Sequence, residues 1–131
     1  MDAAAAIRVL LADDDGAFLN SLRTLIDEQP ELAVVGQAEN GLEAIELAEE
    51  LDPDAVVIDL HMPLLDGVTA VAKLRRDHQH LCLIALTGDE APALHRAVRE
   101  AGADEVLMKT QLVGALVDRL GAVGATEQHA G

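Results

Sequence analysis

Four places in the sequence carry side chains that could do chemistry together. They are an acidic run, a lone aspartate, a hydroxyl and an amine: Asp13-Asp14-Asp15, Asp59, Thr87 and Lys109. Carboxylates held a few ångströms apart repel one another, so some must take up protons unless a cation neutralises them. Two or three hard oxygen ligands with an open side suit Mg²⁺ (or Mn²⁺), which also accepts phosphate oxygens. The set therefore predicts a site for a divalent cation and a phosphoryl group, provided that the fold brings these positions together.

One of the carboxylates could also be a nucleophile toward phosphorus, forming an acyl phosphate. Such an attack needs in-line positioning and neutralised charge, which the metal, Lys109 and Thr87 would supply. Zinc is a poor fit because the set has no cysteine and His61 offers at most one imidazole. Taken singly, each residue has an ordinary explanation, since an aspartate after a strand is often a helix cap. The hypothesis depends on all of them sharing one edge of the fold.

The elements that must position these residues follow from hydrophobic periodicity. Short apolar runs predict five strands, four of them nearly continuous, as in parallel strands covered on both faces. These runs are residues 7–12, 33–38, 55–59, 81–86 and 105–108. Helical spacing of apolar residues between and after them predicts five helices. The first four faces are Phe18, Leu22, Leu25 and Ile26; Leu42, Ile45, Ala48 and Leu51; Val68, Val71, Ala72 and Leu74; and Leu94, Val98 and Ala101. The fifth face is Leu112, Leu116 and Leu120.

Five strand–helix units predict a doubly wound α/β domain, in which ligands bind beyond the carboxyl ends of the strands. The acidic run follows the first predicted strand, Asp59 ends the third, and Thr87 and Lys109 follow the last two. Local signals support the helix ends. Asn40 with Glu43 resembles a capping box, Pro92 suits a first helical turn, and Gly102 suits a helix C-terminus.

Composition narrows the class of function. The chain has 131 residues, enough for one domain, and a formal net charge of −15, so binding to nucleic acid or to an anionic membrane by this chain alone is not expected. Phe18 is the only aromatic residue, which excludes sites that stack a ring on Trp or Tyr. Cys82, the only cysteine, is expected to be a buried small hydrophobe. No signal peptide or membrane span is predicted, and a soluble cytoplasmic protein is expected.

The residues around the four places carry a family resemblance. Residues 56–67 contain the pattern Asp59-x-x-Met62-Pro63-x-x-Asp66-Gly67, and residues 9–14, 86–88 and 107–109 surround the acidic pair, the hydroxyl and the lysine. Together they resemble the receiver domains of two-component response regulators, over about residues 7–121. The segments 7–14 and 102–109 are most similar to receivers that precede a helix-turn-helix output domain.

The resemblance implies a flavodoxin-like, doubly wound five-stranded parallel sheet in the order 2-1-3-4-5, with five helices. We expect a receiver domain over residues 1–121, and the lack of any pattern in residues 122–131 predicts a flexible tail. Asp59 would accept the phosphoryl group from a sensor histidine kinase or a small phosphodonor. Asp14, Asp59 and the backbone carbonyl of His61 would ligate the metal, and Asp13 would act mainly through a metal-bound water. Lys109 would pair with phosphoryl oxygens and Thr87 would hydrogen-bond the group, while Asp15 would be solvated.

The expected protein is a phosphorylation-dependent switch with no enzymatic activity beyond self-phosphotransfer and autodephosphorylation. Its output face would be helix four, strand five and helix five, which includes Leu94, His95, Val98, Val106 and residues 112–119. That face would contact a downstream protein or an effector domain, or form a homodimer. Val106 could be an exposed partner contact or half-covered core. The chain could be a stand-alone receiver, the reading we favour, or a piece of a transcription factor.

Three departures from the family pattern involve four positions. Val106 replaces a common Tyr or Phe, so a switch based on an aromatic rotamer cannot operate in that form. Thr110 replaces a common proline, so no cis peptide is expected there. His61 and Asp89 lie where the rate of phosphoryl hydrolysis is tuned, and we expect a modulated rate; the alternative is that His61 only faces solvent.

Three other classes of protein remain as alternatives. A haloacid-dehalogenase-like phosphatase would need an aspartate where His61 stands. A flavodoxin-like electron carrier would need a hydroxyl- and glycine-rich loop in place of Asp13-Asp14-Asp15, with aromatic residues near the flavin. The main alternative is a pseudo-receiver that binds proteins without phosphorylation.

Overall fold

The computed structural model describes residues 6–62 and 64–109, and in them the chain alternates strands and helices. The strands are β1 (Ile7–Ala12), β2 (Leu32–Ala38), β3 (Ala55–Asp59), β4 (Cys82–Thr87) and β5 (Glu105–Met108). The helices of this part are α1 (Gly16–Asp27), α2 (Gly41–Leu51), α3 (Gly67–Asp77) and α4 (Pro92–Ala101). The predicted fifth helix, the tail 122–131 and Thr110 lie outside the described residues.

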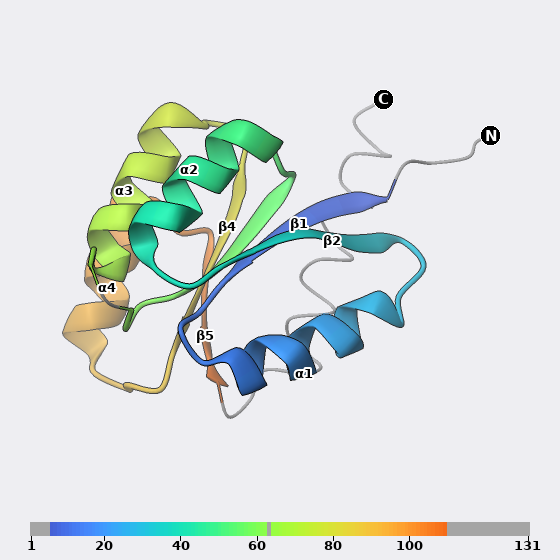
Figure 1. Cartoon of the computed structure of the whole chain (residues 1–131). Helices are drawn as coiled ribbons and strands as arrows, with labels where there is room; N and C mark the ends of the chain where they lie inside the picture. The colour runs from blue at the N-terminus through green and yellow to red at the C-terminus, as the bar shows by residue number, and fades with distance from the viewer. Residues whose placement is uncertain (1–5, 63, 110–131) are drawn as a thin grey trace.

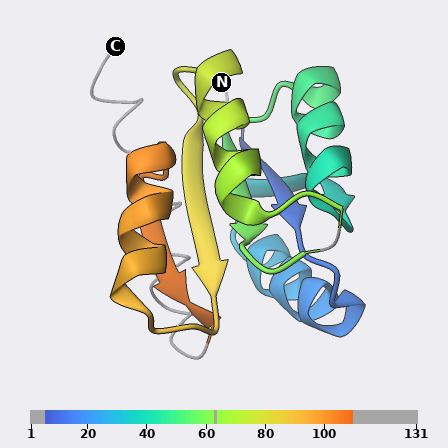
Figure 2. The same ribbon diagram turned by 90° about the vertical axis from the view of Figure 1, so that its left-hand side faces the viewer.

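All five strands are parallel and lie in the order β2-β1-β3-β4-β5, which confirms the predicted sheet. Helix α1 covers one face of the sheet, and α2, α3 and α4 cover the other (Figures 1 and 2). The apolar residues of β1 alternate between the two layers. Leu10 and Ala12 belong to the core under α2, α3 and α4, whereas Val9 and Leu11 belong to the core against α1. Burial on both faces explains why β1 is a continuous apolar run.

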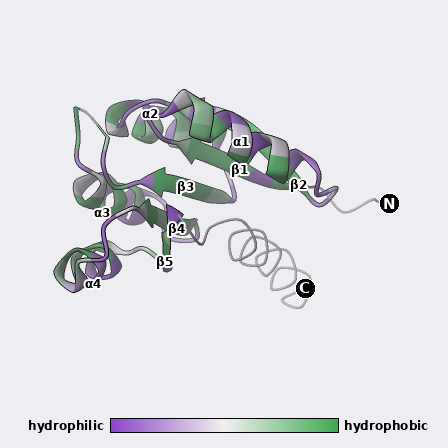
Figure 3. Cartoon of the chain, turned by 90° about the horizontal axis from the view of Figure 1, so that it is seen from below, coloured by the Kyte–Doolittle hydropathy of each residue, from purple (hydrophilic) through white to green (hydrophobic). Residues whose placement is uncertain are grey.

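The helices turn their apolar sides to the sheet, and Figure 3 shows green strands between helices of mixed colour. Two residues of the predicted helix faces are exceptions. Leu42 is 49% exposed and Ala72 is exposed, while Ala44 and Ala70 are buried in their place. Both helices pack with small residues against the sheet, so apolarity alone did not identify every residue of the buried side. Cys82 is half-buried and packs on the α1 side.

The predicted helix ends are confirmed in their main features. Asn40 Oδ1 accepts the Glu43 N–H at 2.8 Å, and Glu43 Oε1 accepts the N–H of Glu39 rather than that of Asn40, at 2.7 Å. Pro92 lies in the first turn of α4, and Gly102 ends that helix with φ 126°. Within the described residues, no helix is both long enough and apolar enough to cross a bilayer.

Candidate functional site

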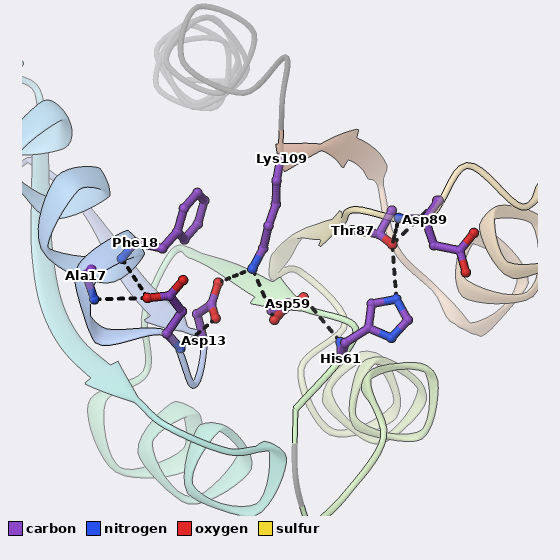
Figure 4. Close-up of polar contacts among 9 residues, drawn as sticks. Asp13, Ala17, Phe18, Asp59, His61, Thr87, Asp89 and Lys109 are labelled. Carbon is purple, nitrogen blue, oxygen red and sulfur yellow. Dashed lines mark hydrogen bonds and ion pairs between the residues drawn. The ribbon is translucent and has the colours of Figure 1, made fainter.

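The carboxyl edge of the sheet gathers the residues that the sequence singled out. Asp13 follows β1, Asp59 ends β3, Thr87 ends β4 and Lys109 follows β5. The strands are parallel and in register, with Asp59 opposite Leu86 and Thr87 opposite Met108, so their ends open on the same side. Figure 4 shows Asp13, Asp59 and Lys109 pointing toward one another, with His61 and Thr87 beside them.

Three carboxylates form the acidic group of this edge. One oxygen from each of Asp13, Asp14 and Asp59 lies within 4.8 Å of the others. Asp13 and Asp59 are buried, at 1% and 3% exposure, whereas Asp14 is exposed. Asp13 Oδ1 accepts the N–H of Asp15 at 2.9 Å, while Asp13 Oδ2 faces the ammonium of Lys109. The group is thus a set of hard oxygen atoms in which two carboxylates are buried and the third is exposed.

Lys109 supplies the opposite charge. Its Nζ lies 2.7 Å from Asp13 Oδ2 and 3.3 Å from Asp59 Oδ2, and it also lies 4.6 Å from the centre of the Phe18 ring. Partial burial alone would lower the pKa of Lys109, but the carboxylates of Asp13 and Asp59 outweigh it and raise that pKa. The ammonium is therefore charged at neutral pH and held between the two buried carboxylates.

One ammonium does not balance three carboxylates. Burial raises the pKa of Asp59, and the nearby Asp13 carboxylate adds to this rise. The N–H of His61, 3.2 Å from Asp59 Oδ1, and the Lys109 ammonium act in the opposite direction but do not cancel it. With all three acids ionised, two negative charges remain uncompensated, which matches one divalent cation. The oxygen donors and the excess charge both fit Mg²⁺.

The loop after Asp59 is held by the residues of the Asp-x-x-Met-Pro-x-x-Asp-Gly pattern. Asp66 caps α3 by accepting the backbone N–H and hydroxyl of Thr69, at 2.9 and 2.8 Å, which lowers the Asp66 pKa. Gly67 lies against Leu60, and a Cβ there would come 2.4 Å from the Leu60 Cα. Met62, a residue of this loop, is buried in the core on the side of α2, α3 and α4. Pro63 lies outside the described residues. The pattern thus keeps the peptide of His61 next to Asp59.

Thr87 and His61 form a second contact at the edge of the site. Thr87 is fully buried, and its Oγ1 accepts the N–H of Asp89 at 2.9 Å. The same oxygen lies 3.3 Å from Nε2 of His61. His61 is exposed, yet its ring faces Thr87 rather than only solvent.

The roles of Asp15 and Phe18 were not predicted from the sequence, and two interpretations of Val106 were left open. Asp15, predicted to be only solvated, is the N-cap of α1, where its Oδ1 accepts the N–H groups of Ala17 and Phe18 at 3.1 and 3.2 Å. Phe18 was assigned to a helix face but also contacts Lys109, and its being the only aromatic residue was a signal that could have drawn attention to it. Val106 is 8% exposed and packs in the core, so the core reading of that residue is confirmed.

Comparisons with known proteins agree with this geometry. A family model for the response regulator receiver domain matches residues 9–121. The protein-glutamate methylesterase/protein-glutamine glutaminase of Alkalilimnicola ehrlichii is 37% identical over 105 residues, which are 79% of this chain and 27% of that protein. The transcriptional regulatory protein LiaR of Bacillus subtilis is 35% identical over 121 residues, which are 92% of this chain and 57% of that protein. The chain therefore spans about a quarter of the first relative and somewhat more than half of the second.

Solved structures share the fold closely. The response regulator domain of Thermotoga maritima CheB has a TM-score of 0.83 and 29% identity, with 90% of this chain and 96% of that chain covered. A LuxR-family two-component response regulator from Aurantimonas has a TM-score of 0.80 and 30% identity, with 90% and 87% covered. The LuxR-family match is in line with the predicted resemblance to receivers of the helix-turn-helix output type.

Proposed function

The chain belongs to the response regulator receiver domain family, and we propose that within it Asp59 accepts a phosphoryl group and thereby switches the domain. The donor would be a sensor histidine kinase or a small phosphodonor such as acetyl phosphate. The observation that carries the proposal is the Lys109 ammonium between the buried carboxylates of Asp13 and Asp59, beside Asp14. This is the charge arrangement that an incoming phosphoryl group requires.

The proposed transfer is a displacement at phosphorus. An oxygen of the Asp59 carboxylate attacks the phosphorus of acetyl phosphate, the bond from phosphorus to the bridging oxygen breaks, and acetate leaves. Hydrolysis restores the free Asp59 carboxylate: water attacks the phosphorus, the Asp59 carboxylate leaves, and inorganic phosphate is released. We propose no further enzymatic activity for the chain.

The other residues act on charge and position. Asp14, Asp59 and the backbone carbonyl of His61 would hold Mg²⁺ or Mn²⁺, with Asp13 acting mainly through a metal-bound water. When bound, the ion would neutralise phosphoryl oxygens. The Lys109 ammonium would contact a phosphoryl oxygen in place of the Asp59 carboxylate, and it would keep its ion pair with Asp13. The Thr87 hydroxyl, at the neighbouring strand end, would donate to a phosphoryl oxygen. Each of these groups stabilises the extra charge that phosphorylation brings, roughly −2 on the group at neutral pH.

The signal would leave through α4, β5 and residues 112–119, the last of which lie outside the described residues. Phosphorylation would favour one of two loop arrangements around Thr87 and so change the surface that a downstream protein, an effector domain or a second copy of the chain contacts. We place this activity in the cytoplasm, within a receiver domain that extends from residue 1 to residue 121.

The test is intact-mass measurement after incubation with acetyl phosphate and Mg²⁺. The wild-type chain should gain the mass of one phosphoryl group, and Asp59→Ala should gain none. Asp15→Ala is the matched control, because it removes an exposed carboxylate two positions from Asp13 that only caps α1, and it should still be phosphorylated.

A wild-type chain that is folded but gains no mass would refute the proposal. That result would favour the alternative of a pseudo-receiver that binds proteins without phosphorylation.

A further inference from the structure

A short path of hydrogen bonds leads from Thr87 into α4. The Thr87 Oγ1 accepts the N–H of Asp89 at 2.9 Å, and the backbone oxygen of Asp89 lies 2.7 Å from Nε2 of His95. Figure 4 shows the beginning of this path, where Thr87 lies between Asp89 and His61. Asp89 is thus bonded through its N–H to the end of β4 and through its carbonyl to a side chain of α4.

The chemistry of the groups fixes the direction of the two bonds in this path. A carbonyl oxygen only accepts, so Nε2 of His95 must carry a proton and donate to Asp89. The Asp89 N–H donates to Thr87, which leaves the Thr87 hydroxyl proton for another acceptor. The carbonyl of Asp89 is 3.5 Å away and already accepts from His95, whereas Nε2 of His61 is 3.3 Å away. Both atoms lie within reach of Oγ1, and the tautomer of the His61 ring sets whether its Nε2 accepts the hydroxyl proton or donates to Oγ1.

The two ends of α4 are held differently. At its C-terminal end, Nε of Arg75 donates to the backbone oxygen of Gly102 at 3.0 Å, and Arg75 also binds Asp104 at 2.8 Å. At its N-terminal end, Ala91 gives no side-chain cap. Two contacts to Asp89 tie this end to the loop: the Ala91 N–H donates to Asp89 Oδ1 at 2.9 Å, and His95 donates to the Asp89 carbonyl. Val98 is the only fully buried residue that the helix contributes.

We propose that His95 is a positioning residue that couples Thr87 to α4 through the Asp89 peptide. The inference rests on the proposed function, since the trigger is the phosphoryl group on Asp59. When the Thr87 hydroxyl turns toward a phosphoryl oxygen, its Oγ1 moves. The Asp89 N–H, which donates to that Oγ1, must then either follow it or lose its acceptor. Because His95 holds the carbonyl of that peptide, the first turn of α4 is moved while Arg75 holds the other end.

The neighbouring strand offers no equal route. Val106, in the middle of β5, is buried and apolar, so its side chain has no group with which to bond Thr87. In the proposed coupling, Thr87 therefore acts on α4 through the hydrogen bonds of Asp89 and not through Val106.

The test compares amide NMR spectra of the whole chain with and without beryllium trifluoride and Mg²⁺, a stable mimic of the phosphoryl group. In the wild type, the amides of Gly88 and Asp89 and those of α4 should shift. In His95→Phe, which keeps a ring but loses the donor, the loop amides should still shift, while the α4 shifts should fall to less than about half, because only the link is cut.

Two variants separate coupling from general damage to the helix. His95→Gln keeps an N–H donor of similar reach and should restore the α4 shifts. Arg96→Ala, at the next position on α4 and exposed, should leave them at the wild-type size.

The outcomes are distinct. Full α4 shifts in His95→Phe, with the loop responding normally, would overturn the coupling and leave the proposed function intact. The same holds if α4 fails to respond in the wild type while the loop shifts. No response at any amide of the wild type would instead refute the proposed function itself.

Discussion

At the scale of single residues, the chemistry of the site comes from burial. Asp13 and Asp59 are nearly inaccessible, so each carboxylate would be costly without a partner, and Lys109 serves both. Burial raises the pKa of Asp59, and the single ammonium of Lys109 does not offset this rise. A divalent cation bound beside Asp59 would therefore stabilise its ionised carboxylate.

Replacing Asp59 with Asn should stabilise the unphosphorylated protein at pH 7. The folded protein binds a proton on Asp59 more readily than the unfolded chain does, so the favourable contribution of this acid is complete only below the ordinary pKa of about 4 and is lost as pH rises through the folded value. At pH 7 without metal, Asp59→Asn should raise the free energy of unfolding by about 1 kcal/mol, the usual size of a single-residue effect. Urea melts at several pH values would show this gain shrinking toward pH 4.

The control for this measurement is Glu46→Gln, which removes one exposed acidic charge on α2. It should change stability by less than about 0.5 kcal/mol. A lower stability of Asp59→Asn at pH 7 would contradict the proposed charge balance.

At the scale of elements, α4 has the fewest buried residues of the four described helices, and its C-terminal end is held by Arg75. Gly102 has φ 126°, which L side chains rarely adopt, and it lies directly against Arg75. The Arg75 side chain donates to the backbone oxygens of Gly102, Gln79 and Leu81, and so joins α3, the start of β4 and the end of α4. This contact gives α4 a fixed end about which its first turn can move.

Gly102→Ala should destabilise the fold. A Cβ at this position would lie 2.6 Å from Cβ and Cγ of Arg75, and the positive φ adds backbone strain. We expect a loss of about 2–4 kcal/mol in the free energy of unfolding, measured by urea denaturation. Gly16→Ala is the control, because a Cβ there meets nothing within 4 Å, and it should be neutral or slightly stabilising. Equal effects of the two substitutions would show that Gly102 is not an anchor.

At the scale of the whole molecule, the net charge of −15 and the carboxylate group act together. The general charge attracts any cation and is screened by salt, whereas the group of Asp13, Asp14 and Asp59 is the site that we propose for one divalent ion. The two effects can be separated, since only the second depends on these three side chains.

Mg²⁺ should therefore raise the melting temperature more than NaCl of the same ionic strength. An ion that binds only the folded protein stabilises it by about 2.7 kcal/mol at 100 times its dissociation constant. Asp14→Asn removes an exposed ligand and should lose most of this specific gain while keeping the gain from NaCl. Scanning calorimetry with chelator, NaCl and MgCl₂ makes the comparison, and equal melting temperatures in the two salts would exclude a specific site.

Much of the fold could be predicted because its signals are local. A continuous apolar run reports a strand buried on both faces, and the shifts of one residue at the starts of β2 and β4 come from pairing with neighbours that the run itself does not reveal. The exposed Leu42 has the same origin, since α2 turns the small residues Gly41 and Ala44 inward, Gly41 against Leu65 and Ala44 into the core. Helix caps were predictable at Asn40 and missed at Asp15, because an aspartate after a strand serves equally as ligand or cap.

The sequence by itself determined which residues stand at strand ends, and therefore that Asp13, Asp59, Thr87 and Lys109 would share one edge. That follows from strand direction alone, because parallel strands must all end on the same side. Only the tertiary structure decided the contacts within that edge: Lys109 against Phe18, His61 against Thr87, and His95 against the carbonyl of Asp89. These pairs depend on the order of the strands, the turn of each loop and the rotamer of each side chain, and no local pattern of residues encodes all three.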